Sequence, residues 1–189
     1  MGHRLPPFEC EITGLGPRGV GLGTAPDGRP IEVRGAPPGS RIAVAPTGRS
    51  KGTWTGRRLA TIRPPAAHAA PRCAQFGLCG GCTLQELTLD AQRALKHQLA
   101  VSQVGPVDGV TIHPPRGAPD AYGYRNKVEL SFGVRRYVSE ADRAANAPID
   151  GRFLGFHAPG RFDRVVDAPR CELVSDAVNQ VIAAVRTAA

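Results

Sequence analysis

Three cysteines lie within ten residues of one another, and a fourth lies far downstream. The clustered thiols follow the spacing Cys-x5-Cys-x2-Cys at Cys73, Cys79 and Cys82, and the distant thiol is Cys171. Three clustered thiols with one remote thiol form a complete ligand set for a four-coordinate metal ion or an iron–sulfur cluster. The glycines at 80–81 allow a tight turn and can donate backbone N–H groups close to sulfur.

The spacing leaves both zinc and an iron–sulfur cluster open. Structural zinc sites usually take two close cysteine pairs, one on each of two turns. Only one such pair exists here, Cys79 with Cys82, and Cys171 has no neighbouring cysteine. This arrangement favours a [4Fe–4S] cluster, which accepts three clustered thiolates and a remote one. The leftover thiol, Cys10, is interpreted as a strand residue without chemistry.

Composition bounds the class of protein. A length of 189 residues suits one large or two small domains, and 41% apolar residues are enough for a folded core. The 18 prolines and 23 glycines favour short strands and loops over a helical bundle. Neither a signal-peptide core nor an apolar run of about 18 residues occurs, so we expect a cytoplasmic protein without a membrane partner. The odd count of five cysteines argues against a pure disulfide framework.

Positive charge is concentrated near the N-terminus. The formal net charge is +8, of which residues 1–72 carry +7 and residues 73–189 carry +1. A basic module points to a polyanionic partner, most simply nucleic acid. The alternative is a solvated basic surface without a partner.

Residues 8–66 have the pattern of a small β module. Glycine- and proline-rich turns at 14–23, 36–39 and 46–52 separate four candidate strands: Phe8–Leu15, Ile31–Val33, Arg41–Ala45 and Thr53–Ile62. Several short strands in about 60 residues predict a five-stranded barrel of OB-like size.

Basic residues surround an aromatic one in the last predicted hairpin of this module. Arg49, Lys51, Arg57 and Arg58 flank Trp54. Such a group suits single-stranded RNA, because rings stack on bases and cations hold phosphates. The alternative, which is the more common one for a lone tryptophan in a small barrel, is that Trp54 belongs to the core.

The remaining residues predict a mixed domain. After a proline-rich linker at 64–72, a helix is expected over Thr83–Val104, with Leu84, Leu87, Ala91, Leu95 and Leu99 on one face. From Asn126, apolar residues at 128, 130, 132 and 134 alternate with polar ones, as in a half-buried antiparallel strand.

The C-terminal part adds shorter elements. An exposed loop is expected over Ser139–Gly151, further strands over Phe153–Phe156 and Arg164–Val166, and a last helix that Ser175 caps. The fold class is therefore α+β: an OB-like barrel followed by an antiparallel-sheet domain. Within the latter, Arg125 and Lys127 either bind phosphate or form a charged strand face.

Four ordered matches, the last of them made of three short segments, resemble one family. The run Cys73–Gln85 is similar to the iron–sulfur loop of RNA uracil-C5-methyltransferases, especially those of the 23S ribosomal RNA type. Val33–Gly39 resembles a turn of their TRAM domain, and Tyr124–Lys127 resembles the strand entry of their central domain. The segments Leu154–His157, Val165–Asp167 and Cys171–Leu173 resemble the approach to the fourth cluster ligand. One departure is Ala74, where relatives often carry proline.

This resemblance implies an organisation. A TRAM-like RNA-binding barrel would occupy residues 8–66, and an iron–sulfur domain would occupy residues 67–189, with a [4Fe–4S] cluster on the four cysteines. The expected partner is RNA, specifically rRNA. In the family, a cysteine adds to C6 of uracil and C5 takes a methyl group from S-adenosylmethionine.

The resemblance places that chemistry in a further C-terminal domain of roughly 150 residues. The chain is expected to end before this domain, so no catalytic residue is assigned and these residues alone are expected to be inactive. S-adenosylmethionine would bind only if a missing C-terminal domain were supplied, and a separate methyltransferase domain is a second expected partner. The alternatives are a free-standing RNA-binding module and a redox-sensing iron–sulfur protein.

Overall fold

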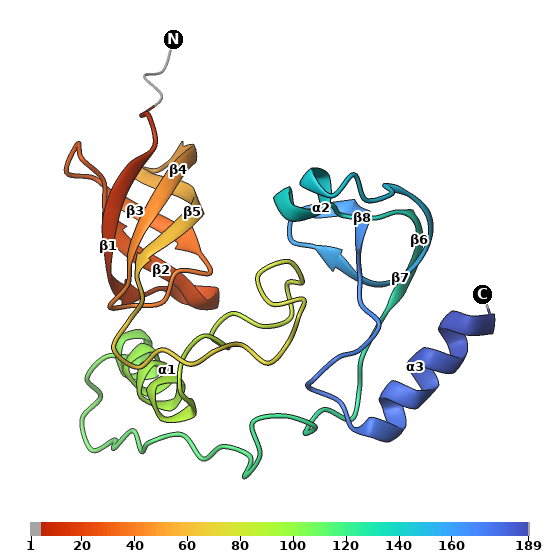
Figure 1. Ribbon diagram of the computed structural model, residues 1–189. Helices are drawn as coiled ribbons and strands as arrows, with labels where there is room; N and C mark the ends of the chain where they lie inside the picture. Colours follow the sequence, from red (N-terminus) through yellow and green to blue (C-terminus); the bar gives the residue numbers. More distant parts are fainter. Residues whose placement is uncertain (1–4, 189) are drawn as a thin grey trace. The chain divides into compact units, whose positions relative to one another are not determined.

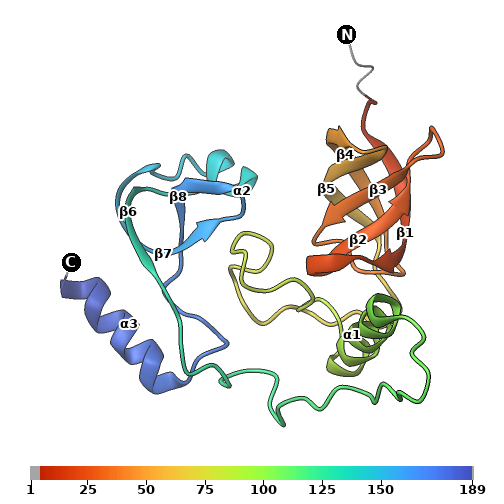
Figure 2. The same cartoon turned by 180° about the vertical axis from the view of Figure 1, so that it is seen from behind.

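The computed structural model describes residues 5–188, and the side chains of all of these except residues 140 and 141. The chain divides into two compact units (Figures 1 and 2). The first unit comprises the residues up to Ala70 together with Thr83–Gly117. The second comprises Pro71–Cys82 together with the residues from Ala118 onward. Among the described residues, no helix is long and apolar enough to cross a membrane.

A closed five-stranded barrel forms the body of the first unit (Figure 1). Its strands, with a single 3-10 turn at Pro17–Gly19, are β1 (Phe8–Leu15), β2 (Val20–Thr24), β3 (Pro30–Arg34), β4 (Arg41–Ser50) and β5 (Thr53–Arg63). They pair in the order β1-β2-β3-β5-β4, and only the β3–β5 pair is parallel. The expected five-stranded barrel is confirmed.

Alternating side chains fill the barrel. Its buried cluster comprises Cys10, Ile12, Ala25, Ile31, Val33, Ala36, Ile42, Val44 and Trp54. Trp54 is only 6% exposed, and its Nε1–H donates to Asp27 Oδ2 at 3.0 Å. The core interpretation of Trp54 is therefore confirmed, as is that of Cys10 as a buried strand residue.

Two predicted turns of the barrel are strands. The segment 14–23 contains β2, and β4 runs on to Ser50 through the segment expected to turn at 46–52. The glycines of β2 do not form a turn; they let a neighbouring backbone approach the strand closely. A Cβ at Gly21 would lie 2.0 Å from the carbonyl oxygen of Ala36. Sequence patterns assign such glycines to loops because the neighbouring backbone is not visible in them.

The helix of the first unit begins later than expected. Helix α1 spans Leu89–Val104, and the hydroxyl of Thr88 accepts a hydrogen bond from the Ala91 N–H at 3.4 Å. Leu84 and Leu87 are buried, but they lie in a turn whose backbone pairs with residues 67–69. The helical spacing of apolar residues extends back past the cap at Thr88 to Leu84, so this spacing did not indicate where the helix begins.

The second unit is built on an antiparallel sheet in the order β6-β7-β8 (Figure 1). Its elements are β6 (Ser131–Arg135), α2 (Glu140–Ala144), β7 (Asp150–Ala158), β8 (Arg161–Asp167) and α3 (Asp176–Ala188). The core cluster consists of Leu154, Val174 and Ile182, with partly buried Val128, Leu130, Cys171 and Val178. The α+β class is thus confirmed.

Two expectations for this unit needed correction. The strand predicted from Asn126 is paired as a strand only over β6; Val128 and Leu130 pack into the core, whereas Phe132 and Val134 are exposed. A short helix, α2, lies in the segment predicted as a loop. The predicted cap of the last helix is confirmed, because the Val178 N–H donates to Ser175 Oγ at 3.4 Å.

Candidate metal centre

The three clustered cysteines lie on a compact loop of the second unit. Backbone N–H groups of Phe76 and Cys79 donate to the carbonyls of Cys73 and Gln75 at 3.1 and 3.0 Å, which folds the loop back on itself. The Gly81 N–H then donates to Cys79 Sγ at 3.4 Å. The expectation that a glycine N–H would approach sulfur is confirmed at this position.

The thiol of Cys79 senses the other three cysteines of the motif. Burial raises the pKa of the Cys79 thiol above its ordinary value, and the Gly81 N–H opposes this effect. The negative charges of Cys82, Cys73 and Cys171 raise the pKa of Cys79 further. The fold therefore brings Cys171 within electrostatic reach of the loop that carries the other three cysteines. All five cysteines of the chain are thiols rather than disulfides.

The thiols approach one another without closing on one point. Among the described residues, no three His, Cys, Asp or Glu side chains are placed to hold a single metal ion. Cysteine thiolates nevertheless have the chemistry of the four ligands that a cluster takes, one at each iron. Thiolates are ligands of zinc as well, so the residue types alone leave both zinc and a cluster open.

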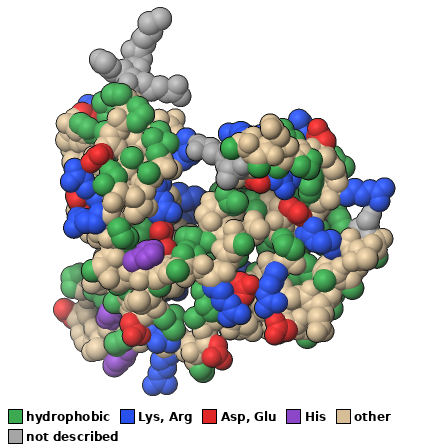
Figure 3. Space-filling model, in the orientation of Figure 1, with side chains coloured by type: hydrophobic (Ala, Val, Ile, Leu, Met, Phe, Trp, Pro, Cys, Tyr) green, Lys and Arg blue, Asp and Glu red, His purple; other side chains and the backbone are tan. Residues whose placement is uncertain are grey.

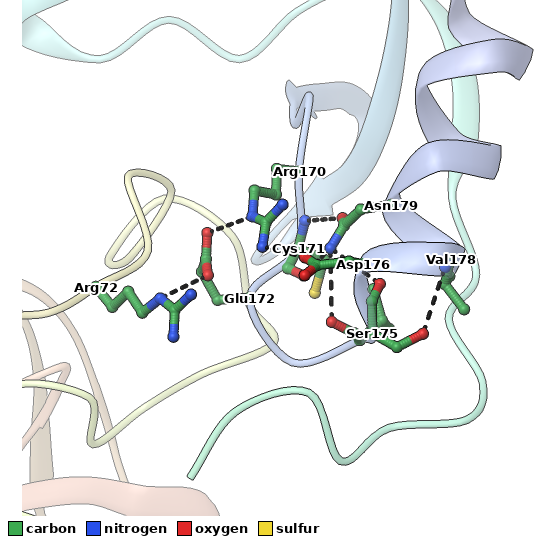
Figure 4. Close-up of polar contacts among 9 residues, drawn as sticks. Arg72, Arg170, Cys171, Glu172, Ser175, Asp176, Val178 and Asn179 are labelled. Carbon is green, nitrogen blue, oxygen red and sulfur yellow. Dashed lines mark hydrogen bonds and ion pairs between the residues drawn. The ribbon is translucent and has the colours of Figure 1, made fainter. Parts of the chain in front are cut away.

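A buried asparagine of α3 holds the segment that carries the fourth cysteine (Figure 4). Asn179 is 7% exposed; its Oδ1 accepts from the Cys171 N–H at 2.9 Å, and its Nδ2 donates to the Cys171 carbonyl at 3.1 Å. The same Nδ2 lies 3.2 Å from the carbonyl oxygen of Ser175. One side chain thereby satisfies both backbone groups of Cys171.

An ionic network surrounds the next residue, Glu172 (Figure 4). Arg170 Nε donates to Glu172 Oε1 at 2.9 Å, and the second oxygen, Oε2, lies 2.8 Å from Arg72 Nε. The Arg72 contact has the distance of an ion pair without the alignment of a hydrogen bond. A further guanidinium nitrogen of Arg170 donates to Asp176 at 2.8 Å. Arg72 also lies over the ring of Tyr122, 5.1 Å from its centroid.

A pocket of about 410 Å³ adjoins this network. It is lined by Arg72, Asp120, Ala121, Tyr122, Gly123, Arg170, Glu172, Val174, Ser175 and Asp176. Three carboxylates face two guanidinium groups there, and two of these carboxylates already pair with the arginines. This balance of charge does not favour an anionic ligand.

The cysteine loop also contacts the turn between β7 and β8. A Cβ added at Gly80 would lie 3.2 Å from Cγ of Pro159, which is closer than most side-chain contacts allow. Gly80 is therefore suited to its position because Pro159 packs directly against its backbone. The turn and the loop form one packed contact within the second unit.

Curated proteins similar to this chain are named as RNA methyltransferases. An uncharacterized RNA methyltransferase of Chlorobaculum tepidum is 31% identical over 185 residues, which is 95% of this chain and 38% of that protein. The 23S rRNA (uracil(1939)-C(5))-methyltransferase RlmD of Methylococcus capsulatus is 32% identical over 196 residues, which is 97% of this chain and 41% of that protein. The chain belongs to the RNA (uracil-5-)-methyltransferase family.

The match concerns part of each family member. The chain corresponds to an N-terminal part of these proteins and spans 38% and 41% of the two relatives just named. A third relative, the RlmD of Alkalilimnicola ehrlichii, is 39% identical over 135 residues, or 68% of this chain and 30% of that protein. No protein-family model matches the chain. The family resemblance seen in the motifs is confirmed.

The basic residues expected to contact RNA occupy different environments. Arg49 lies over the ring of Trp54, 5.4 Å from its centroid, Lys51 is in the β4–β5 turn, and Arg57 is exposed on β5. Arg58, in contrast, donates from one guanidinium nitrogen to both carboxylate oxygens of buried Glu86, at 3.0 and 2.9 Å. Its charge is thus engaged inside the first unit. On the face shown in Figure 3, Lys and Arg side chains are spread over the barrel rather than gathered in one patch.

The other two candidates lie in the second unit. The backbone N–H of Arg125 donates to the Leu173 carbonyl at 2.7 Å, which leaves its exposed side chain outside that pairing. Lys127 Nζ lies 2.6 Å from Glu129 Oε1, and this contact raises the pKa of Lys127. A charged strand-like surface and a phosphate contact are both compatible with this arrangement.

Several residues around the family's cysteine motif escaped sequence reasoning. Asn179, Glu172 and Pro159 each hold a cysteine-bearing segment, yet none belongs to a recognisable spacing with the thiols. A weak signal existed for two residues, because Arg72 directly precedes Cys73 and Glu172 directly follows Cys171. Opposite charges beside the first and last members of a ligand set are a pattern worth testing for an ion pair.

Proposed function

We propose that these residues form the RNA-binding and iron–sulfur portion of an S-adenosylmethionine-dependent RNA (uracil-C5) methyltransferase that acts on rRNA. The observation that carries the proposal is the gathering of four thiols, one of them about ninety residues distant from the others in sequence, within one unit of a chain whose relatives are named 23S rRNA methyltransferases. Family membership supports the reaction class, and the thiols support the cofactor.

The [4Fe–4S] cluster would be held by Cys73, Cys79, Cys82 and Cys171. Cysteine at all four irons leaves no open coordination position, so the cluster supplies a cross-link rather than a Lewis acid. The protein residues position this cross-link: Asn179 fixes the backbone of Cys171, and the Gly81 N–H approaches Cys79 Sγ. A cross-link between loop and remote segment stabilises the fold across a long stretch of sequence.

Residues 8–66 would serve as a TRAM-like RNA-binding barrel, and residues 67–189 as the iron–sulfur domain. Arg49, Lys51 and Arg57 are the proposed phosphate contacts on the barrel, with Arg125 and Lys127 in the second unit. Arg58, which we expected to join them, has its charge already paired with Glu86. Cations that hold the backbone without reading bases suit a folded RNA with unpaired segments.

Methyl transfer is assigned to the part of the longer relatives that this chain does not span. S-adenosylmethionine and the nucleophilic cysteine would reside there, in the same polypeptide or in a separate methyltransferase domain. An rRNA substrate also favours a cytoplasmic location. A redox-sensing iron–sulfur protein is the second candidate. Its function would not require the net charge of +7 that residues 1–72 carry.

The test combines metal analysis with RNA binding. Protein purified without oxygen should be brown and contain about four irons and four sulfides per chain. It should also bind an rRNA stem-loop with unpaired uridines, and its affinity should fall steeply with salt. Cys79→Ser and Cys171→Ser should each abolish the colour, whereas Cys10→Ser should keep it, because Cys10 lies in the barrel core.

The opposite results are equally specific. A colourless protein with one zinc per chain would refute the cluster while leaving RNA binding to be judged separately. A brown protein with no affinity for any RNA would refute the RNA-binding assignment and favour the redox-sensing alternative.

A further inference from the structure

The end of the β7–β8 hairpin exposes an aromatic side chain to solvent. Phe162 is 85% exposed, the highest value among the large apolar side chains of the described residues. It lies two residues after Gly160 of the turn, in the first part of β8. A scattered exposed valine needs no explanation, but a nearly bare aromatic ring at the end of a hairpin is a candidate contact for a partner.

The neighbours of Phe162 are an aromatic residue and two cations. The ring of His157 lies 6.1 Å from that of Phe162, tilted by 59°. Arg161 precedes Phe162, and Arg164 follows two residues later. Both arginines bind the carboxylate of Asp163: Arg161 through two nitrogens at 2.9 Å, and Arg164 through Nε at 3.2 Å. These guanidinium groups hold the pKa of Asp163 well below its usual range.

The hairpin end is supported by the candidate metal centre. Pro159 of the turn packs on Gly80, between the cysteines Cys79 and Cys82. A loop held by metal–thiolate bonds would therefore fix the position of the turn that presents Phe162. A turn that is already fixed in place loses less conformational entropy when a planar group stacks on the ring that it presents.

We propose that this hairpin end is a stacking site for one unpaired RNA base, and this inference rests on the proposed function. The ring of Phe162 takes the base and His157 flanks it. Arg161 and Arg164 share the single carboxylate of Asp163, and the net positive charge of this group faces the adjoining phosphate. Unpaired bases in RNA loops are bound in this way, by aromatic faces with neighbouring arginines. Positive charge beside the ring distinguishes this partner from an apolar protein surface, which gains nothing from Arg161.

The experiment compares ring-keeping and ring-removing variants of the full chain. The probe is an rRNA stem-loop with 2-aminopurine at an unpaired position, whose fluorescence is quenched by stacking. Phe162→Leu should weaken binding roughly tenfold and abolish the quench, because it keeps apolar character but removes the stacking face. Phe162→Trp should preserve both affinity and quench. Asp163→Asn should increase affinity, because it releases two arginines towards phosphate.

The matched control is Phe132→Leu, since Phe132 is the next most exposed phenylalanine, at 62%, and lies on β6 away from the turn. It should leave affinity and quench within twofold of the natural chain. The phenylalanine variants should melt at the same temperature as the natural chain, because the replaced rings are largely in solvent.

Equal affinity and equal quench for Phe162→Leu and the natural chain would overturn the stacking site while the proposed RNA binding stands. An equal loss for Phe132→Leu would also overturn it, since binding would then depend on exposed apolar surface in general. Absence of RNA binding by the natural chain is a separate outcome that refutes the proposed function itself.

Discussion

Arg72 forms an ion pair with Glu172, with 2.8 Å between Nε and Oε2. Arg72 directly precedes the first cysteine of the candidate metal centre, and Glu172 directly follows the last. The pair therefore joins the two chain segments that would bind the same cluster. Glu172 is largely buried and has a second partner in Arg170, so its charge is neutralised from both sides. This contact holds the Cys73 and Cys171 segments together through protein atoms alone.

The network predicts a non-additive response to mutation. Arg72→Ala should lower the unfolding free energy of the second unit by about 0.5–1 kcal/mol, the range of a partly exposed pair. Arg170→Ala should have a modest effect too, because Arg72 still faces Glu172. The double variant should lose more than the sum, since a mostly buried carboxylate is then left without a cation. Urea denaturation of the metal-free protein measures all three.

Arg161→Ala is the control for that cycle. Arg161 pairs with Asp163, only two residues away and on the surface, so its loss should not change stability measurably. Strict additivity of the Arg72 and Arg170 effects would contradict the shared role of Glu172.

Asn179 provides a second, uncharged test of the same region. Asn179→Ala should cost about 1–3 kcal/mol, because the Cys171 N–H loses its partner and the Cys171 carbonyl keeps only the Val174 N–H, at 3.4 Å. The thiol of Cys171 should also react faster with an alkylating reagent once its segment is released. Gln180→Ala, at the exposed neighbouring position of α3, should change neither quantity. Slow alkylation and unchanged stability in Asn179→Ala would show that other contacts hold the segment.

The difference between these residues and the cysteines explains what the sequence could predict. The cysteines can be recognised from their residue type and spacing. Strand β1 and the cap at Ser175 can be predicted from local rules of alternation and hydrogen bonding. Asn179 acts through a contact that exists only after α3 folds against the Cys171 segment. No local pattern distinguishes it from an ordinary polar residue of a helix.

The errors in the fold have the same origin. Strand β2 was missed because its glycines, which allow the backbone of Ala36 to approach closely, resemble a turn in the sequence. Phe132 was predicted to be buried because it continues the alternation of apolar residues, but it is exposed, whereas Leu130 packs against the core. Periodicity reports which residues can share a face, while tertiary packing decides which of them are covered. Among the residues proposed to contact RNA, Arg58 was the hardest to assign, because the sequence does not show that it meets Glu86.

The Arg58–Glu86 ion pair allows an effect on stability to be measured separately from an effect on RNA binding. Arg58→Ala should lower the unfolding free energy of the first unit by about 3 kcal/mol, because Glu86 is 7% exposed and would lose its cation. Arg58→Met combined with Glu86→Leu should recover most of that loss. Arg57→Ala, at an exposed position of β5, should leave melting unchanged but weaken RNA binding and reduce its salt dependence.

Thermal melting and binding to the rRNA stem-loop distinguish these effects. If the double variant at 58 and 86 regains stability and binds RNA normally, Arg58 is structural. Equal melting and equal RNA affinity for Arg57→Ala and the natural chain would remove Arg57 from the proposed interface.

Trp54 links the barrel core to acid stability. Its Nε1–H donates to Asp27 and is the main cause that holds the pKa of Asp27 below its ordinary value, ahead of Arg29. A depressed carboxyl pKa stabilises the folded state above the unfolded value of about 3.9, and this contribution is lost as pH falls through the folded value. Trp54→Phe should raise the pKa of Asp27 towards its ordinary value and flatten the fall in stability below about pH 4.

NMR titration of the Asp27 carboxyl and acid unfolding of the barrel measure the two effects. Arg29→Ala is the control: it should also raise the pKa of Asp27, but it leaves in place the Trp54 hydrogen bond, which is the largest single cause of the shift. Trp54→Phe should bind the rRNA stem-loop as the natural chain does, since a ring that is 6% exposed cannot stack on a base without unfolding. A selective loss of RNA affinity in Trp54→Phe, at unchanged melting temperature, would instead restore Trp54 to the RNA interface.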